Sequence, residues 1–192
     1  MKHYAITGNI GSGKSTVCSV FEIMGIPIYY SDARAKGLMS NNQELINSLK
    51  SLLGDDVYND KNQLDRAKMA SIIFKDRDIL EKVNAIVHPA VRKDYLKWRA
   101  EQNAPYTIQE SALTFEIEAE KYVDGVLLVY APEELLIERS MKRGNVSREQ
   151  VIDRLSKQMD QELKKEKANY VINNSLGVSL IKQVILLHEI LQ

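Results

Sequence analysis

The chain has 192 residues, and its 26 basic and 26 acidic side chains leave no formal net charge at pH 7. This length can bury the core of one medium-sized domain, whereas a neutral chain lacks the positive surface expected of a dedicated nucleic-acid binder. The one cysteine, Cys18, cannot form an internal disulfide, and no Cys/His spacing typical of a metal site is present.

No apolar run approaches the ~20 residues of a membrane helix. The first residues already belong to an expected strand, which leaves no room for a signal peptide. We therefore expect a cytoplasmic protein that binds neither nucleic acid nor a membrane.

The most specific motif begins at the eighth residue and reads Gly8-Asn9-Ile10-Gly11-Ser12-Gly13-Lys14-Ser15-Thr16. It matches the phosphate-binding loop pattern G-x-x-x-x-G-K-[ST] at every required position. An apolar run at 4–7 predicts a strand before it, and apolar residues spaced as a helix face predict a helix over 15–24 after it. A strand, a glycine loop and a helix in this order indicate a site for a nucleoside triphosphate.

The residue types of the loop explain its chemistry. The glycines admit backbone conformations in which successive N–H groups turn toward an anion, and the positive end of the new helix points at the same place. Lys14 adds a charge for the β- and γ-phosphates, and the Ser15 hydroxyl can hold Mg²⁺. The expected nucleotide-binding residues are Gly11, Ser12, Gly13, Lys14, Ser15 and Thr16.

A second strand is predicted over 26–30, which completes a βαβ unit and hence a parallel sheet. From residue 33 to about 105 the pattern turns helical and polar, without a convincing strand. Leucines at 45–53 predict one helix ended by Gly54, and apolar residues from Met69 to Phe74 predict another. A third, over 80–87, is expected to break at His88-Pro89, because a proline disfavours a helical residue before it.

Three further strands are predicted, over 106–110, 126–130 and 170–173. Helices are expected over 132–144, from Arg148 to Lys167 behind a capping box at 147–150, and over 178–191. Strands alternating with helices predict a doubly wound α/β domain with a five-stranded parallel sheet, a P-loop three-layer sandwich. The D-x-x-G and N-K-x-D motifs of GTPases do not occur after the strands where they are expected. We therefore expect a kinase architecture.

The order of motifs resembles the dephospho-coenzyme A kinase family over essentially the whole chain. The loop is shared by many proteins, but its combination with His88-Pro89, Glu116 and Arg154…Gln158 is specific. The residues that carry the resemblance are Ile6–Thr16, Asp32, Leu64-Asp65-Arg66, Ile86-Val87-His88-Pro89, Leu113-Thr114-Phe115-Glu116, Arg139–Arg143, Arg154–Gln158 and Val171–Asn174. Three positions depart from the family pattern, where aspartate, proline and aspartate are usual: Tyr30, Ala112 and Asn169.

The resemblance implies transfer of the γ-phosphoryl group of ATP, with Mg²⁺, to the ribose 3′-hydroxyl of dephospho-CoA. We expect a monomer of one kinase domain, with a core at 1–32 and 106–192 and a helical insertion at about 33–105. The resemblance makes the insertion the acceptor-binding part and implies a lid at about 143–167. A nucleoside or nucleoside-monophosphate kinase would share the loop, sheet and lid, so this function remains an alternative. A nucleotide-binding regulatory module without transfer activity is a second alternative.

Asp32 is the candidate general base, because it lies at the carboxyl end of the second strand, where open α/β sheets bind ligands. It could instead only N-cap the helix expected near Ala33. Glu110 ends the third strand beside the loop and is the candidate for holding Mg²⁺, or else an ordinary strand-end charge.

Arginines suit the charge that spreads over phosphoryl oxygens in the transition state. We expect Arg143 and Arg139 to act in catalysis and Arg154 to bind ATP, although arginines on polar helices are often only solvated. The resemblance assigns acceptor binding to Asp32, Arg66, His88, Arg92 and Glu116. His88 could equally cap a helix end, and Glu116 could be a solvated helix residue.

Overall fold

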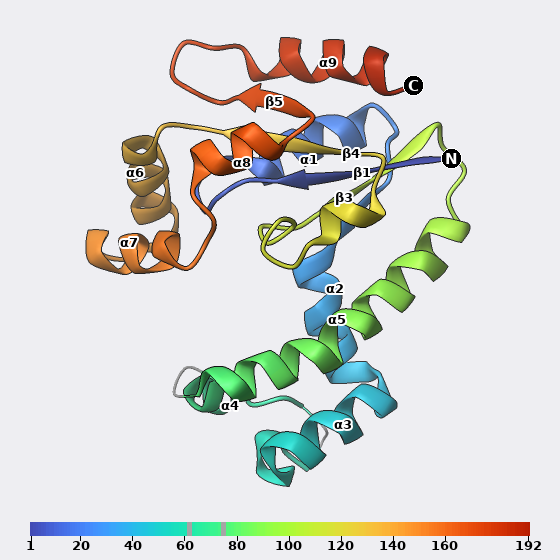
Figure 1. The fold of residues 1–192 in the computed structure, drawn as a ribbon, viewed down its shortest axis with the longest axis vertical. Coiled ribbons are helices and arrows are strands. Elements are labelled where there is room, and N and C mark those ends of the chain that lie inside the picture. Colours follow the sequence, from blue (N-terminus) through green and yellow to red (C-terminus); the bar gives the residue numbers. More distant parts are fainter. Residues whose placement is uncertain (61–62, 74–75) are drawn as a thin grey trace. The chain divides into compact units, whose positions relative to one another are not determined.

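The computed structural model describes residues 1–60, 63–73 and 76–192. The chain forms two compact units (Figure 1). Unit 1 comprises Met1–Tyr30 and Gln102–Gln192, and unit 2 comprises Ser31–Glu101. The description from the sequence, one kinase domain with an insertion and a lid, stays a prediction.

Unit 1 is built on the parallel sheet that the sequence predicts. Its strands are β1 (Lys2–Thr7), β2 (Ile28–Tyr30), β3 (Tyr106–Glu110), β4 (Gly125–Tyr130) and β5 (Tyr170–Asn173). They lie in the order β2-β3-β1-β4-β5, and every neighbouring pair is parallel. The central strand β1 therefore ends between the carboxyl ends of β3 and β4, and the predicted five-stranded α/β fold is confirmed.

The two faces of this sheet are covered by different segments. Helices α1 (Lys14–Ile23) and α9 (Leu180–Leu191) bury their apolar residues against alternate strand positions such as Ile6. On the other face Phe115, Ala5 and Val126 form a smaller cluster, and helix α8 packs against β4. This alternation is what a strand buried on both faces requires, since successive side chains point to opposite sides.

Three helices follow β4, where two were expected. They are α6 (Glu133–Gly144), α7 (Arg148–Ser156) and α8 (Gln161–Lys167). The predicted capping box at the start of α7 is present. The single helix predicted from Arg148 to Lys167 is wrong, because the Asp160 carboxylate accepts hydrogen bonds from the backbone of Glu162 and Leu163 and begins a new helix.

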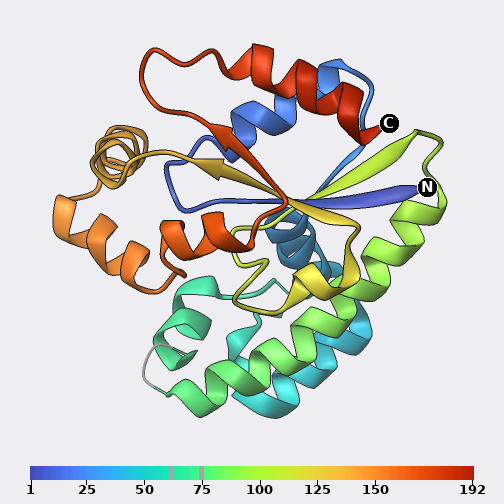
Figure 2. The same cartoon turned by 45° about the horizontal axis from the view of Figure 1, so that its top comes forward.

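Unit 2 consists of helices around its own apolar cluster. They are α2 (Ser31–Asn41), α3 (Gln43–Leu53), a 3₁₀ turn η1 (Asp55–Val57), α4 (Arg66–Ile73) and α5 (Arg77–Ala100). Figure 2 shows the long green helix α5 beside the other helices of this unit. The cluster is centred on Leu45, Ile46, Leu49, Val57, Val83 and Val87.

The predicted helix at 45–53 is confirmed, and Gly54 follows it with a φ of 97°. The predicted helix at Met69 is confirmed as α4, while Phe74 lies outside the described residues. The predicted break at His88-Pro89 is wrong, since α5 continues through the exposed Pro89. Val87 before the proline and Tyr95 after it are both buried, and burying one continuous apolar face outweighs the lost backbone hydrogen bond.

Within residues 1–60, 63–73 and 76–192, no helix has both the length and the apolar composition needed to cross a membrane.

Candidate active site

The glycines of the phosphate-binding loop have the backbone conformations that the motif demands. Gly11 and Gly13 have φ angles of 81° and 95°, in the left-handed region that favours glycine. A Cβ on Gly11 would overlap the Leu136 carbonyl oxygen in α6, and one on Gly13 would overlap the Asn174 side-chain amide. Both glycines therefore let other segments approach the loop closely.

Helix α1 begins at Lys14, so its free N–H groups point back at the loop. The Lys14 ammonium donates to the Gly8 carbonyl oxygen at 2.8 Å. Ser15 and Thr16 are exposed in the first turn of the helix. The predicted nucleotide-binding residues 11–16 thus form one continuous loop and helix start.

Asn174, just beyond β5, holds the middle of the loop. Its side-chain amide donates to the Ser12 carbonyl oxygen at 2.7 Å, and its backbone N–H donates to the Tyr130 carbonyl oxygen at 2.7 Å. The ends of β4 and β5 are therefore tied to the loop through one residue. Sequence reasoning assigned Asn174 no role, although it belongs to the motif Val171–Asn174.

The break between α7 and α8 holds the first half of the loop. The Ile10 N–H donates to the Gln158 side-chain oxygen at 3.0 Å, and the Asn9 amide donates to the Met159 carbonyl oxygen at 3.2 Å. Four residues, 157–160, separate the two helices. These contacts were not foreseen, although Gln158 carries part of the family motif.

Glu110 lies beside the loop at the carboxyl edge of the sheet. In the parallel register it is level with Ile6 of β1 and Tyr30 of β2, and the Ser111 N–H donates to the Ile6 carbonyl oxygen at 3.1 Å. Burial raises the pKa of the Cys18 thiol, and the neighbouring Glu110 carboxylate acts in the same direction.

Tyr30 stands where the family often has an aspartate, and it stays a neutral phenol. Burial is the main cause that raises its pKa, and Cys18 and a hydrogen bond with Glu22 add to the effect. It therefore cannot replace a carboxylate base at neutral pH, and the role of Asp32 stays a prediction.

Among the described residues there is no group of three or more His, Cys, Asp or Glu that could hold a metal ion. Ser15 and Glu110 do offer oxygen atoms, the ligands that Mg²⁺ prefers, and Mg²⁺ is usually bound by one or two protein ligands together with substrate phosphates. The residues present thus fit a magnesium ion that binds with the nucleotide.

The predicted arginines lie on α6 and α7. Gly11 approaches α6 at Leu136 and Ser140, and positions 136, 139, 140 and 143 fall within about 100° of one another around a helix of 3.6 residues per turn. Arg139 is partly buried, and its Nη1 has no hydrogen-bond partner among the described residues. Arg143 is exposed one turn further along, and Arg154 is exposed on α7.

Glu116 lies in the segment after β3 and forms an ion pair with Lys164 of α8, at 2.9 Å. The same carboxylate oxygen accepts a hydrogen bond from the Met159 N–H at 2.8 Å. Its other oxygen is buried and has no hydrogen-bond partner among the described residues. The acceptor-binding role of Glu116 stays a prediction.

The other predicted acceptor residues belong to unit 2. Helix α2 begins at Ser31, so the exposed Asp32 lies inside its first turn instead of capping it. His88 and Arg92 are four residues apart on α5 and share a face. Burial lowers the pKa of His88, so its imidazole is mainly neutral at pH 7. Arg66 is exposed at the start of α4.

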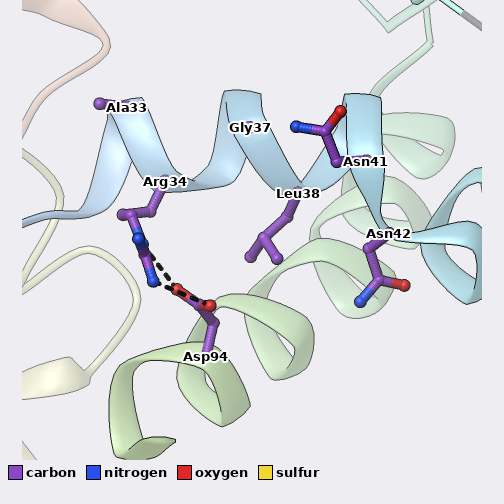
Figure 3. Close-up of a pocket in the computed structure, with 7 residues that line it drawn as sticks. All are labelled: Ala33, Arg34, Gly37, Leu38, Asn41, Asn42 and Asp94. Carbon is purple, nitrogen blue, oxygen red and sulfur yellow. Dashed lines mark hydrogen bonds and ion pairs between the residues drawn. The ribbon is translucent and has the colours of Figure 1, made fainter. Parts of the chain in front are cut away.

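A pocket of about 360 Å³ lies between α2 and α5 within unit 2 (Figure 3). The Arg34 guanidinium donates to both oxygens of Asp94, at 2.8 and 3.0 Å, and closes one end. The pocket is lined by Ala33, Arg34, Gly37, Leu38, Asn41, Asn42 and Asp94. None of the four acceptor residues predicted in unit 2 is among them.

The chain is similar to known proteins over nearly its full length. The family model described as dephospho-CoA kinase matches residues 3–179. A dephospho-CoA kinase of Porphyromonas gingivalis is 39% identical over 185 residues, which cover 96% of this chain and 91% of the relative.

Two solved structures extend this similarity to three dimensions. TT1252 from Thermus thermophilus has a TM-score of 0.87 and 34% identity, with coverage of 98% of this chain and 97% of that one. A dephospho-CoA kinase from Campylobacter jejuni has a TM-score of 0.70 and 26% identity, with coverage of 98% and 96%.

The close contact between Gly11 and α6 yields a first prediction. Gly11→Ala should weaken ATP binding at least about tenfold and destabilise the fold by about 1–3 kcal/mol, because the new methyl group meets a backbone carbonyl. Gly25→Ala is the matched control, since Gly25 also has a positive φ, 81°, but no atom within 4 Å of its Cβ position. Isothermal titration calorimetry and thermal unfolding measure both effects, and equal ATP affinities for the two variants would contradict the prediction.

Proposed function

We propose which residues of this chain bind and convert its substrates; the chain itself belongs to the dephospho-CoA kinase family. The chain is an ATP-dependent phosphotransferase that acts on an alcohol group, the ribose 3′-hydroxyl of dephospho-CoA.

The donor half of the site is proposed to be the loop with its surrounding arginines. The backbone N–H groups of 11–16 and the Lys14 ammonium bind the phosphates, and the lysine exchanges its contact with Gly8 for phosphate oxygens. Arg139 is the better supported of the two catalytic arginines, because its buried Nη1 has no hydrogen-bond partner among the described residues and α6 is the helix that Gly11 approaches. Arg143 acts from the next turn, and Arg154 binds ATP from α7.

Mg²⁺ is proposed to bind with ATP at Ser15, with Glu110 holding it through a water molecule. The ion would neutralise charge on the β- and γ-phosphates as the phosphoryl group moves. The position of Glu110, level with Ile6 at the sheet edge, supports this assignment.

Asp32 is proposed as the general base that takes the proton of the 3′-hydroxyl as its oxygen attacks phosphorus. It follows β2 by two residues, so the covalent chain keeps its Cα within about 7.6 Å of the end of that strand. Its exposed position in the first turn of α2 leaves the carboxylate accessible to a substrate.

The acceptor half is proposed to lie in unit 2, with Arg66 and Arg92 as the cations for the substrate pyrophosphate. His88 would bind as a neutral hydrogen-bonding group, because burial lowers the pKa of its imidazole. Glu116, which the resemblance also assigns to the acceptor, belongs to unit 1. We further propose a cytoplasmic monomer of one kinase domain that engages neither nucleic acid nor a membrane.

The match of the dephospho-CoA kinase family model across residues 3–179 is the observation that carries the function. Purified protein with ATP and Mg²⁺ should convert dephospho-CoA to CoA with release of ADP. AMP, CMP and nucleosides should be phosphorylated far more slowly under the same conditions. Preferred turnover of any of these acceptors, or ATP binding without transfer to any acceptor, would overturn the proposal.

The Asp32 assignment predicts that Asp32→Asn lowers kcat by about 10²-fold or more, the usual contribution of a general base. The affinity for ATP should stay nearly unchanged, because Asp32 is not part of the donor half. Asp78→Asn is the matched control, since it also removes a carboxylate from the first turn of a helix in unit 2. If Asp32→Asn lowers only the melting temperature, as the control would, Asp32 serves the helix and not the reaction.

A further inference from the structure

Lys164 is a fully buried lysine on a helix whose other lysines are exposed. Its side chain has 0% exposure, and its ammonium donates to Glu116 Oε1 at 2.9 Å and to the Ala112 carbonyl oxygen at 3.0 Å. Burial lowers the pKa of Lys164, although Glu116 opposes this effect. Removing an ammonium group from water is unfavourable unless it is paired, and a buried ion pair is by itself weak evidence for stability. Stability alone therefore does not explain why Lys164 is buried.

Glu116 connects this buried charge to the break between α7 and α8. Its Oε1 accepts both from Lys164 and from the Met159 N–H, at 2.9 and 2.8 Å. The carboxylate is largely shielded, with 18% exposure. Since Lys164 belongs to α8 and Met159 precedes that helix, the ion pair fixes the backbone at the point where the two helices separate.

The break is in turn bonded to the phosphate-binding loop. Met159 accepts from the Asn9 side chain through its carbonyl oxygen, at 3.2 Å, and Gln158 accepts from the Ile10 N–H at 3.0 Å. A continuous series of hydrogen bonds therefore runs from Lys164 through Glu116 and Met159 to the first half of the loop.

We propose that Lys164 and Glu116 are positioning residues for the nucleotide. Their ion pair holds residues 158–159 against the loop, and this contact keeps the backbone N–H groups of the loop aimed at the phosphates of ATP. A phosphate site made of backbone donors depends on the position of each peptide, and an error of about 1 Å in such a site can cost about 10²-fold in rate. The inference rests on the nucleotide-binding role proposed for the loop.

A positioning role and an acceptor-binding role for Glu116 affect different substrates. An acceptor residue influences the KM for dephospho-CoA, whereas a residue that positions the loop influences the KM for ATP. Glu116→Gln keeps an oxygen that can accept from Met159 but leaves the buried Lys164 charge uncompensated. The positioning role predicts that this variant raises the KM for ATP, whereas acceptor binding predicts that it raises the KM for dephospho-CoA.

The first test is Lys164→Met, which keeps the length of the buried side chain and removes its charge. The KM for ATP and the Kd for ADP should each rise by about tenfold or more, while the KM for dephospho-CoA changes by less than about twofold. Lys165→Met is the matched control, since Lys165 is exposed on the same helix and its pair with Glu162 spans 3.5 Å.

A double variant extends the test, and a second site keeps it decisive if Lys164→Met is too unstable. Lys164→Met with Glu116→Gln removes both charges, so it should recover part of the nucleotide affinity lost in Lys164→Met. Gln158→Ala leaves the ion pair intact and removes only the acceptor of the Ile10 N–H. It should raise the KM for ATP with little change in melting temperature.

The outcomes separate this inference from the proposed function. Variants that melt earlier but bind ADP as tightly as Lys165→Met would overturn the positioning role and leave the loop assignment intact. A higher KM for dephospho-CoA alone would overturn it in favour of acceptor binding. Failure of both the natural protein and Lys165→Met to bind ADP would overturn the loop assignment itself.

Discussion

The close packing of the phosphate-binding loop against its neighbours is the constraint on which the site depends. Gly11 lies against the backbone of α6, and Gly13 lies against the Asn174 amide that holds the Ser12 carbonyl. Because the phosphates are bound largely by backbone donors, the segments packed around the loop must hold its backbone in shape. The central position of β1 in the sheet makes this possible, because it places Glu110 on one side of the loop and the ends of β4 and β5 on the other.

The elements that could be predicted are those whose signal lies within a few residues. The glycine pattern of the loop, the apolar runs of the strands and the capping box before α7 are all local, and each is present. The two errors in the helices have one origin. At Pro89 the helix continues because residues on both sides of the proline are buried. At Asp160 an N-cap begins a second helix where the polar composition predicts a single one. In both, the effect of a single residue depends on the segment around it.

The contacts that shape the site could not be predicted, because their partners are far apart in the chain. Ile10 and Gln158 are separated by 148 residues, and Ser12 and Asn174 by 162. The sequence predicts one strongly polar helix from Arg148 to Lys167, and nothing local distinguishes the buried Lys164 from its exposed neighbours. The family motifs did contain Gln158, Glu116 and Asn174, so the resemblance identified residues whose physical task only the fold explains.

The burial of Cys18 has a practical consequence for measuring distances between the two units. This thiol is the chain's one cysteine, it has 0% exposure, and burial raises its pKa. Maleimide and methanethiosulfonate reagents attack an accessible thiolate, so the natural protein should stay unlabelled without any substitution in its core. A surface cysteine introduced in each unit would then carry all of the fluorophore or spin label. Distances between the units could be followed in solution, with and without nucleotide, on an otherwise unaltered chain.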